Sequence, residues 1–377
     1  MLAGTPFSVS WLQEILTKKL NTTAHLISAN CAPTAQGDGF YSRIVKTHLE
    51  WSPTDSALPK CIILKIPTAD RYKESHGGSG TSDLFAEQLE RVHNCECAFY
   101  DAFGEVDGLA LPTIYHTQWI GVGLPEAVIV MNDLSHFVML DIMPGFCNQQ
   151  LFAVVDALAA LHARCMKNSD WIEVVDKAQP DKKAFCDLFL AMKAEFDIRI
   201  KRSFPQLLEK SVQFNRIFDM DQLYDRLHNS HRNLGIPPVA IHGDLWVKNI
   251  FWESIPSSDD FKIASIIDWQ NARPGNLMED VSSLLYVGCA GEMRSKLFET
   301  VPHFYLSRLE LYLGKESMNL KLKQIQLALE EMKIAGVFAV ICAFPFLLDM
   351  DEIKNSEEKT NQLVIRCGEA LDDLIKN

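Results

Sequence analysis

The sequence predicts an α+β protein of two lobes, with a small β-rich first lobe and a larger, mainly helical second lobe. The chain has 377 residues, which is more than one ordinary core of about 150 residues usually holds. Strand-like runs gather in the first third, and apolar residues recur at helical spacing along most of the chain after about Leu151. Hydrophobic residues make up 47% of the chain, so enough apolar side chains are available for both lobes.

Three strands and one helix account for the predicted first lobe. The predicted strands are residues 39–51 (GFYSRIVKTHLEW), 61–67 (CIILKIP) and 127–134 (AVIVMNDL), whose apolar and aromatic residues are typical of strands. Between the last two strands, residues 84–103 repeat apolar positions with the period of a helix.

The second lobe is expected to be helical apart from one strand pair. Residues 151–166 (LFAVVDALAALHARCM) are the clearest amphipathic helix, and residues 249–254 and 261–269 predict two strands joined by a polar turn. The least structured crossover lies near residues 131–137 (MNDLSHF). We therefore predict two domains, residues 1–134 and residues 135–377.

Composition narrows the classes of function. The chain has 36 basic and 49 acidic residues, a net charge of −13, which disfavours non-specific binding to nucleic acid or anionic membranes. Its ten cysteines include no C-x-x-C pair and predict reduced thiols rather than zinc ligands. The first residues do not resemble a signal peptide, and the apolar run at 334–348 contains Pro345 and is too short for a membrane span. We expect a cytoplasmic protein whose apolar run is a buried helix.

The stretch VAIHGDLWVKNIF, residues 239–251, concentrates polar side chains between apolar runs. It contains the pattern H-G-D-L-x-x-x-N, and a second acid, Asp268, ends the next strand. Phosphoryl transfer needs a carboxylate that deprotonates the attacking hydroxyl, and an amide and a carboxylate that hold Mg²⁺ against the phosphates. The pattern predicts Asp244 as the base and Asn249 and Asp268 as metal ligands. Each alone would fit a turn or a strand end, but their order and spacing favour the catalytic interpretation.

Two charged residues in apolar surroundings complete the predicted chemistry. Lys65 stands alone in an apolar strand, where an unpaired ammonium would be costly. Glu96 lies about 20° around the helix from Phe85, on its apolar face, whereas Glu87 and Glu90 point away. We predict that Glu96 pairs with Lys65 and holds it against the nucleotide phosphates. The alternative is a lysine at an exposed strand edge and a glutamate in a fraying turn.

The remaining nucleotide contacts are predicted by position. Gly37 and Gly39 precede a strand and could cover the phosphates, although the full G-x-G-x-x-G pattern is absent from AQGDGFYSRIV. The strand that ends at Met131, Asn132 and Asp133 runs between the predicted lobes, so its backbone is a candidate to pair with the adenine edge.

These motifs together resemble a known superfamily. HGDLWVKN with IIDW, LKIP, the Glu96 helix ending in CAFY, and LAALHA look like the aminoglycoside phosphotransferase and choline kinase superfamily, in detail its ecdysteroid-kinase-like (CHK) branch. The resemblance spans most of the chain. It implies a bilobal protein-kinase-like fold, ATP and Mg²⁺, and phosphorylation of a hydroxyl on a small molecule. By position it gives the roles inferred above to Asp244, Asn249, Asp268, Lys65 and Glu96.

The resemblance also implies supporting residues and shows departures. His242 would brace the catalytic loop, and Asp280 would brace that loop or cap the following helix; a structural role is favoured for both. The glycine loop departs from the family, and Asn132 stands where this branch often has an acidic residue. Both departures concern nucleotide affinity more than chemistry.

The acceptor is expected to be a small molecule. Only WQNARPGNLME separates Asp268 from Asp280, which leaves no room for an extended activation loop that docks a peptide. The helical segment at 170–233, rich in aromatic and acidic residues, would supply acceptor contacts. A hydroxysteroid, another lipophilic alcohol or a xenobiotic is the first choice, and choline or ethanolamine the second. A nucleotide-binding pseudokinase without turnover is the alternative from a different class.

Overall fold

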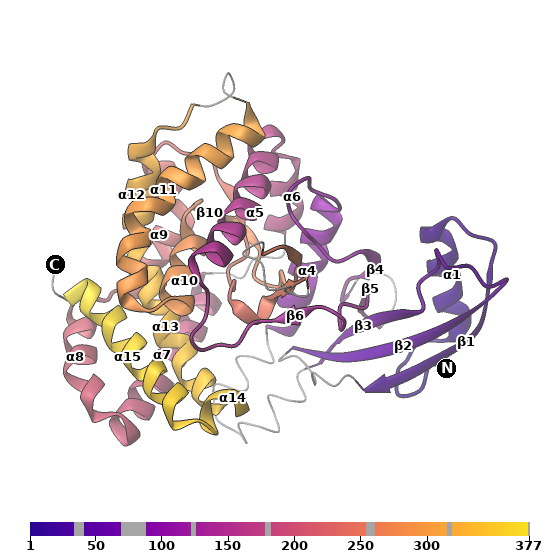
Figure 1. The fold of residues 1–377 in the computed structure, drawn as a ribbon, viewed down its shortest axis with the longest axis horizontal. Coiled ribbons are helices and arrows are strands. Elements are labelled where there is room, and N and C mark those ends of the chain that lie inside the picture. Colours follow the sequence, from indigo (N-terminus) through magenta and orange to yellow (C-terminus); the bar gives the residue numbers. More distant parts are fainter. Residues whose placement is uncertain are drawn as a thin grey trace. The chain divides into compact units, whose positions relative to one another are not determined.

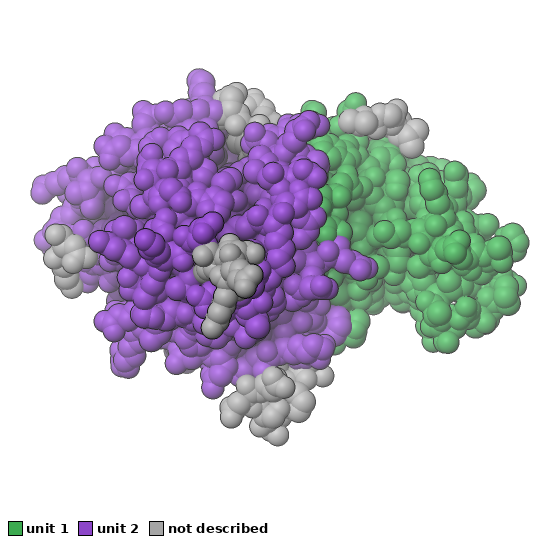
Figure 2. Space-filling model, turned by 90° about the horizontal axis from the view of Figure 1, so that it is seen from above, with its two compact units in different colours: residues 1–104, 111–136 green, residues 105–110, 137–377 purple. Residues whose placement is uncertain are grey.

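The computed structural model describes residues 1–33, 41–68, 88–121, 126–177, 182–253, 261–314 and 319–375. The chain divides into two compact units, coloured separately in Figure 2. The first unit holds residues 1–104 and 111–136, and the second holds residues 105–110 and 137–377. The sequence analysis did not anticipate that residues 105–110 belong to the second unit. They contact that unit: the Ile266 amide donates to the Ala110 carbonyl at 2.8 Å, and Gly108 lies so close to Ala160 that a Cβ there would stand 2.9 Å from the Ala160 Cβ.

A five-stranded antiparallel sheet forms the first unit. Its strand order is β1-β2-β3-β5-β4 (Figure 1). The central strand β3 carries alternating apolar residues of CIILKIP, so that Ile62 and Leu64 are fully buried on one face and Lys65 lies on the other. Predicted strands correspond to β2, β3 and β5, whereas β1 and β4 were not predicted. The strands span His25–Pro33 (β1), Ser42–Ser52 (β2), Cys61–Pro67 (β3), Ile114–Gln118 (β4) and Val128–Asn132 (β5).

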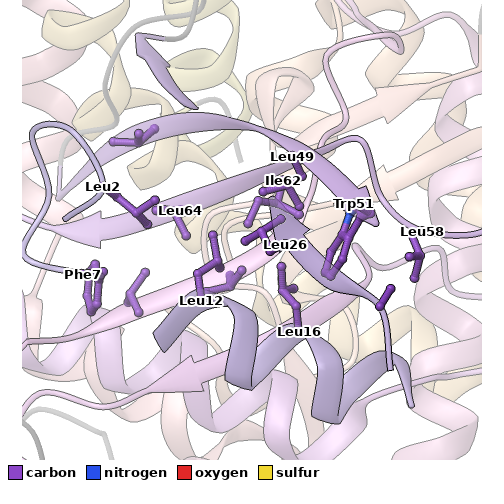
Figure 3. Close-up of a cluster of buried hydrophobic side chains, with 14 residues drawn as sticks. Leu2, Phe7, Leu12, Leu16, Leu26, Leu49, Trp51, Leu58, Ile62 and Leu64 are labelled. Carbon is purple, nitrogen blue, oxygen red and sulfur yellow. The ribbon is translucent and has the colours of Figure 1, made fainter. Parts of the chain in front are cut away.

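The face of the sheet opposite Lys65 is covered by α1, Val9–Leu20, which the sequence analysis did not identify. Ser8 caps this helix by accepting a hydrogen bond from the Trp11 amide at 3.0 Å. Leu12 and Leu16 are fully buried in a cluster that includes Leu26, Leu49, Trp51, Ile62 and Leu64 (Figure 3). One face of the sheet is therefore occupied by the core, and the face with Lys65 is left for other contacts.

The second helix of this unit is α4, Leu89–Phe103. Its buried face includes Val92, Phe99 and Phe103, as the apolar repeat predicts, and Glu96 is buried among them. Glu90 is exposed, which confirms that it points away from this face. Phe85 and Glu87 lie outside the described residues.

The second unit is mainly helical (Figure 1). Its helices are α5 (Asn148–Lys167), α6 (Asp170–Asp176), α7 (Lys182–Ser203), α8 (Leu208–Ile217), α9 (Met220–Asn233), α10 (Glu279–Gly288), α11 (Gly291–Leu313), α12 (Leu322–Glu331), α13 (Lys333–Asp349), α14 (Asp351–Lys354) and α15 (Glu357–Ile375). Its short strands are β6 (Val138–Met139), β7 (Val239–Ile241), β8 (Ile250–Trp252), β9 (Ile263–Ile266) and β10 (Arg273–Gly275). They form a β6-β8-β9 sheet and a β10-β7 pair. The predicted strand pair is β8 with β9, and the predicted α+β class is confirmed.

The apolar run at 334–348 forms most of α13, which packs against α10, α15 and α7. Gly336 allows the close approach to α10, because a Cβ there would stand 2.4 Å from Cδ2 of Tyr286. Residues 322–349 are long and apolar enough for a membrane span by composition, but 67% of the most apolar window is buried inside the protein. This burial agrees with the predicted core helix.

Candidate active site

The H-G-D stretch forms a loop after β7 whose backbone is held by a buried carboxylate. The amides of His242 and Gly243 donate to the two oxygens of Asp280, at 2.6 and 2.9 Å. The His242 ring is fully buried, and its Nε2 lies 2.9 Å from the Ile267 carbonyl oxygen. The ring is tilted by 46° against that of Trp269, with the ring centroids 4.5 Å apart. Its Nδ1 lies 3.3 Å from the Asp244 amide. These contacts make His242 and Asp280 positioning residues for the loop.

Gly243 is the residue that permits this turn. Its φ is +77°, in the left-handed region that glycine adopts without strain. A Cβ at this position would also lie 2.6 Å from the Asn271 carbonyl oxygen. The G of the H-G-D pattern is thus required by backbone geometry and by space.

The structure brings the predicted base and metal ligands together within the second unit. The Asn249 side chain donates from Nδ2 to the Asp244 carbonyl at 2.8 Å, which leaves its amide oxygen as the atom able to act as a ligand. The Asn249 carbonyl accepts from the Ile267 amide at 3.0 Å, directly before Asp268. Asp268 has a φ of +68°, a conformation that costs free energy outside glycine and that gathers at functional sites.

The charges of two other acidic side chains act on Asp244. Solvent reaches this residue, but the protein around the carboxyl still removes part of its hydration. This desolvation, followed by the charges of Asp268 and Asp280, raises the pKa of Asp244 to about 8, against the opposing hydrogen bond of Gln270. A divalent cation would relieve that repulsion, so the donor set fits Mg²⁺.

The types of protein donor also suit Mg²⁺. Mg²⁺ is commonly held by one or two carboxylates together with substrate phosphates and water, rather than by a complete protein cage. Asn249 and Asp268 are donors of that kind, and their role as ligands stays a prediction.

The predicted ion pair in the first unit is present. Lys65 Nζ lies 2.6 Å from Oε2 of Glu96, and the two side chains are 12% and 2% exposed. The Tyr100 hydroxyl, one helical turn further on, donates to the other oxygen of Glu96 at 3.3 Å. The alternative of an exposed lysine and a fraying glutamate is therefore wrong. Tyr100 was not predicted, although its i+4 spacing from Glu96 was visible in the sequence.

We expect Lys65→Met and Glu96→Gln each to lower turnover strongly, and the double variant to lose little beyond the worse single variant. When two residues act through one ion pair, the effects of substituting them are not additive, because the first substitution already removes the contribution of the pair. A double-mutant cycle on nucleotide-dependent turnover measures this. Losses that multiply, or a single variant with normal turnover, would contradict the functional pairing.

Folding must be controlled in this cycle, because leaving one charge of a buried pair unmatched costs about 3 to 5 kcal/mol. Thermal melts of each variant report that cost. The half-buried pair of Lys210 and Asp372, with atoms 2.8 Å apart in the second unit, gives a matched control. Its substitution should change stability and leave turnover unchanged.

The predicted adenine-contacting residues have mixed surroundings. Met131 is buried within β5 and paired with Ile63 of β3. The Asn132 side-chain oxygen accepts from the Thr113 amide at 2.8 Å, so this side chain is occupied in holding two backbone segments together. Asp133 pairs with Lys46 at 2.7 Å. Gly37 and Gly39 lie outside the described residues.

Two contacts of the loop at residues 242–249 were missed by the sequence analysis. Lys248 pairs with Glu352 of α14 at 2.7 Å and donates to the Leu140 carbonyl at 2.8 Å, which ties the loop to distant segments of the chain. Trp246 is half-buried and meets Phe346 of α13 edge to face, with ring centroids 6.0 Å apart. Neither partner shares a motif with the loop, so only the fold reveals them.

Two solved structures were compared with this fold. A choline kinase from Cryptosporidium parvum matches with a TM-score of 0.50 and 11% identity, over 92% of this chain and 91% of that one. An ethanolamine kinase from Plasmodium vivax matches with a TM-score of 0.46 and 12% identity, over 95% and 87% of the two chains. The first similarity supports a bilobal kinase-like fold.

Two Caenorhabditis elegans proteins are similar in sequence. "Uncharacterized oxidoreductase dhs-27" is 28% identical over 334 residues, which cover 84% of this chain and 39% of that protein. "Uncharacterized kinase-like protein D1044.1" is 25% identical over 249 residues, which cover 65% and 64%. The chain thus spans less than two thirds of the length of either relative. A family model, DUF1679, matches residues 2–377. Since that match covers nearly every residue, the chain belongs to the family DUF1679, whose description is "Uncharacterized oxidoreductase dhs-27".

Proposed function

We propose that this protein is a small-molecule kinase that transfers the γ-phosphate of ATP to a hydroxyl group. The proposal is carried by the geometry of one loop. Asp280 accepts hydrogen bonds from the backbone amides of His242 and Gly243, and the Asn249 side chain donates to the Asp244 carbonyl. This loop presents a carboxylate with a raised pKa beside two oxygen donors suited to Mg²⁺.

The proposed reaction assigns one step to each group. Asp244 accepts the proton of the acceptor hydroxyl as the hydroxyl oxygen bonds to the γ-phosphorus, and the bond from that phosphorus to the β,γ-bridging oxygen breaks to release ADP. Asn249 and Asp268 would hold Mg²⁺, which supplies neutralisation of phosphate charge when bound. Lys65, oriented by Glu96, would contact the phosphates of ATP.

The acceptor is proposed to be a neutral, lipophilic alcohol, such as a hydroxysteroid or a hydroxylated xenobiotic. Trp246 lies two residues after the proposed base, is half-buried and meets Phe346 edge to face, so it is a candidate for aromatic contact with the acceptor. The resemblance to the ecdysteroid-kinase-like branch supports the same class. Choline or ethanolamine is the alternative, since the structural matches include kinases named for both and an indole ring also attracts quaternary ammonium groups.

An oxidoreductase is a less suitable candidate. The name of one relative contains that word, and this chain spans 39% of that relative. Rossmann-type dinucleotide sites lie on a mostly parallel sheet, whereas the sheet of the first unit pairs its strands in antiparallel fashion throughout. A pseudokinase that binds ATP without turnover is the other alternative. A cytoplasmic location and the lack of a nucleic-acid partner remain predictions from the sequence.

The function is tested with purified protein, Mg²⁺ and γ-labelled ATP against hydroxylated compounds of three kinds. These are neutral ring alcohols such as 2-(2-naphthyl)ethanol and hydroxysteroids, the small amino alcohols choline and ethanolamine, and the polycation kanamycin. We expect label in the neutral alcohols. Label only in the amino alcohols would support the alternative acceptor, and nucleotide binding without label in any compound would support the pseudokinase.

A further inference from the structure

Lys46 lies on the sheet face that carries Lys65. In the register of β2 with β3, Ile44 pairs with Lys65 and Lys46 pairs with Ile63. Paired residues of neighbouring strands share a face, and so do alternate residues along one strand. Lys46 is therefore beside Lys65 on the face that the α1 core leaves uncovered, displaced along the strands by two residues, or about 7 Å.

The Lys46 side chain extends across this face toward the end of β5. The next strand beyond β3 is β5, where Met131 pairs with Ile63. Lys46 Nζ nevertheless reaches residues that follow β5, at 2.7 Å from Asp133 Oδ2 and 2.8 Å from Ser135 Oγ. Its stem must pass over the row formed by Ile63 and Met131 to do so.

In the cluster of Lys46, Asp133 and Ser135, both charged side chains can form further hydrogen bonds. Asp133 also accepts from the amide and the hydroxyl of Ser135, at 3.0 and 2.9 Å. An ammonium has three donors and a carboxylate about four acceptor positions. Within the described part of the chain, Lys46 thus retains one donor and Asp133 one acceptor, side by side. Their side chains are 24% and 14% exposed, so a ligand can reach them.

We propose that Lys46 and Asp133 together recognise the base of the bound nucleotide, Lys46 as donor and Asp133 as acceptor. The inference rests on the proposed function, in which the phosphates of the nucleotide lie at Lys65 and its base lies toward the end of β5, where the sequence predicts the adenine contacts. The 6-amino group of adenine donates, and the adjacent N7 accepts. Guanine places two acceptors, O6 and N7, on that edge, and O6 would face the Asp133 carboxylate. The cluster therefore favours ATP over GTP.

Calorimetric titration of the whole protein with Mg²⁺–ATP tests the inference. We expect Lys46→Met to weaken ATP binding about tenfold or more, the effect of losing one charged hydrogen bond. Lys60→Met is the matched control, because Lys60 is exposed just before β3 and its substitution changes the net charge by the same amount. The affinity of this variant for Mg²⁺–ATP should stay within twofold of the wild type. Thermal melts confirm that both variants fold.

Two base-altered probes separate recognition of the base from attraction of the phosphates. Purine riboside triphosphate, which lacks the 6-amino group, should bind the wild type about tenfold more weakly than ATP, and GTP should bind more weakly as well. Inorganic tripolyphosphate should bind wild type and Lys46→Met alike. An equal loss for tripolyphosphate would assign Lys46 to the phosphates and overturn the inference.

Other results also decide the matter. Tighter ATP binding by Lys46→Met would mean that Lys46 only covers this face. Binding within twofold of the wild type would mean that Lys46 makes no contact with the base. Either result would overturn the inference and leave the proposed function standing. Failure of the wild type to bind any nucleotide would overturn the proposed function, and the inference with it.

Discussion

Asp244→Asn is expected to lower phosphoryl transfer by about 10² to 10⁴-fold while Mg²⁺–ATP binding stays near the wild-type affinity. The substitution keeps the shape of the side chain but removes the group that takes the acceptor proton. Because Asp244 is proposed to act on the acceptor, the nucleotide should lose little. Transfer is measured with labelled ATP and the best acceptor of the screen, and ATP binding by calorimetry.

The control for this variant is Asp176→Asn. Asp176 is exposed at the end of α6, in the same unit, so the change in charge is the same and the catalytic loop is untouched. It should transfer phosphate at the wild-type rate. A normal rate for Asp244→Asn would show that another group is the base.

Asp268→Asn is expected to lose the Mg²⁺-dependent part of ATP binding, by about tenfold or more, together with activity. A carboxylate bonds a cation more strongly than an amide does, and a charged interaction of this kind is worth roughly 1.5 to 3 kcal/mol. Asparagine is a better replacement than alanine here. It tolerates the left-handed conformation, and Asp268 has a φ of +68°, so the backbone can keep its path.

The measurement is a pair of ATP titrations, with Mg²⁺ and with a chelator. The variant should resemble the wild type in chelator and differ from it in Mg²⁺. Equal affinities in Mg²⁺ would remove Asp268 from the ligand set, and equal losses in both conditions would indicate a misfolded loop rather than a missing ligand. A thermal melt distinguishes the second case.

The sequence by itself determined the elements that have strong local patterns. The alternation in CIILKIP and the apolar repeat at 84–103 located β3 and α4, and the same repeat placed Glu96 on the buried face. The ion pair followed from two anomalies, a base in an apolar strand and an acid on an apolar face, because buried charges need partners. The H-G-D-L-x-x-x-N pattern likewise marked the loop that joins Asp244 and Asn249, because these residues lie in one contiguous run.

Elements with weak or non-local sequence patterns were determined only by the tertiary structure. The helix α1 and the strand β1 have short and mixed apolar patterns, and burial against the sheet rather than local propensity fixes them. Residues 105–110 join the second unit through contacts with residues distant in sequence, such as the backbone bond to Ile266 and the close approach of Gly108 to Ala160, which no local signal marks.

The hydrogen bonds around the candidate site also join residues that are far apart in the sequence. Asp280 lies 38 residues from His242 and Glu352 lies 104 residues from Lys248, so their hydrogen bonds are set by the fold. Lys46 shows the limit most clearly. In sequence it is one polar residue of a predicted strand. Only the register of β2, β3 and β5 places it on the Lys65 face within reach of Asp133. Strand register depends on pairing between distant segments, and the sequence of one strand alone does not contain that information.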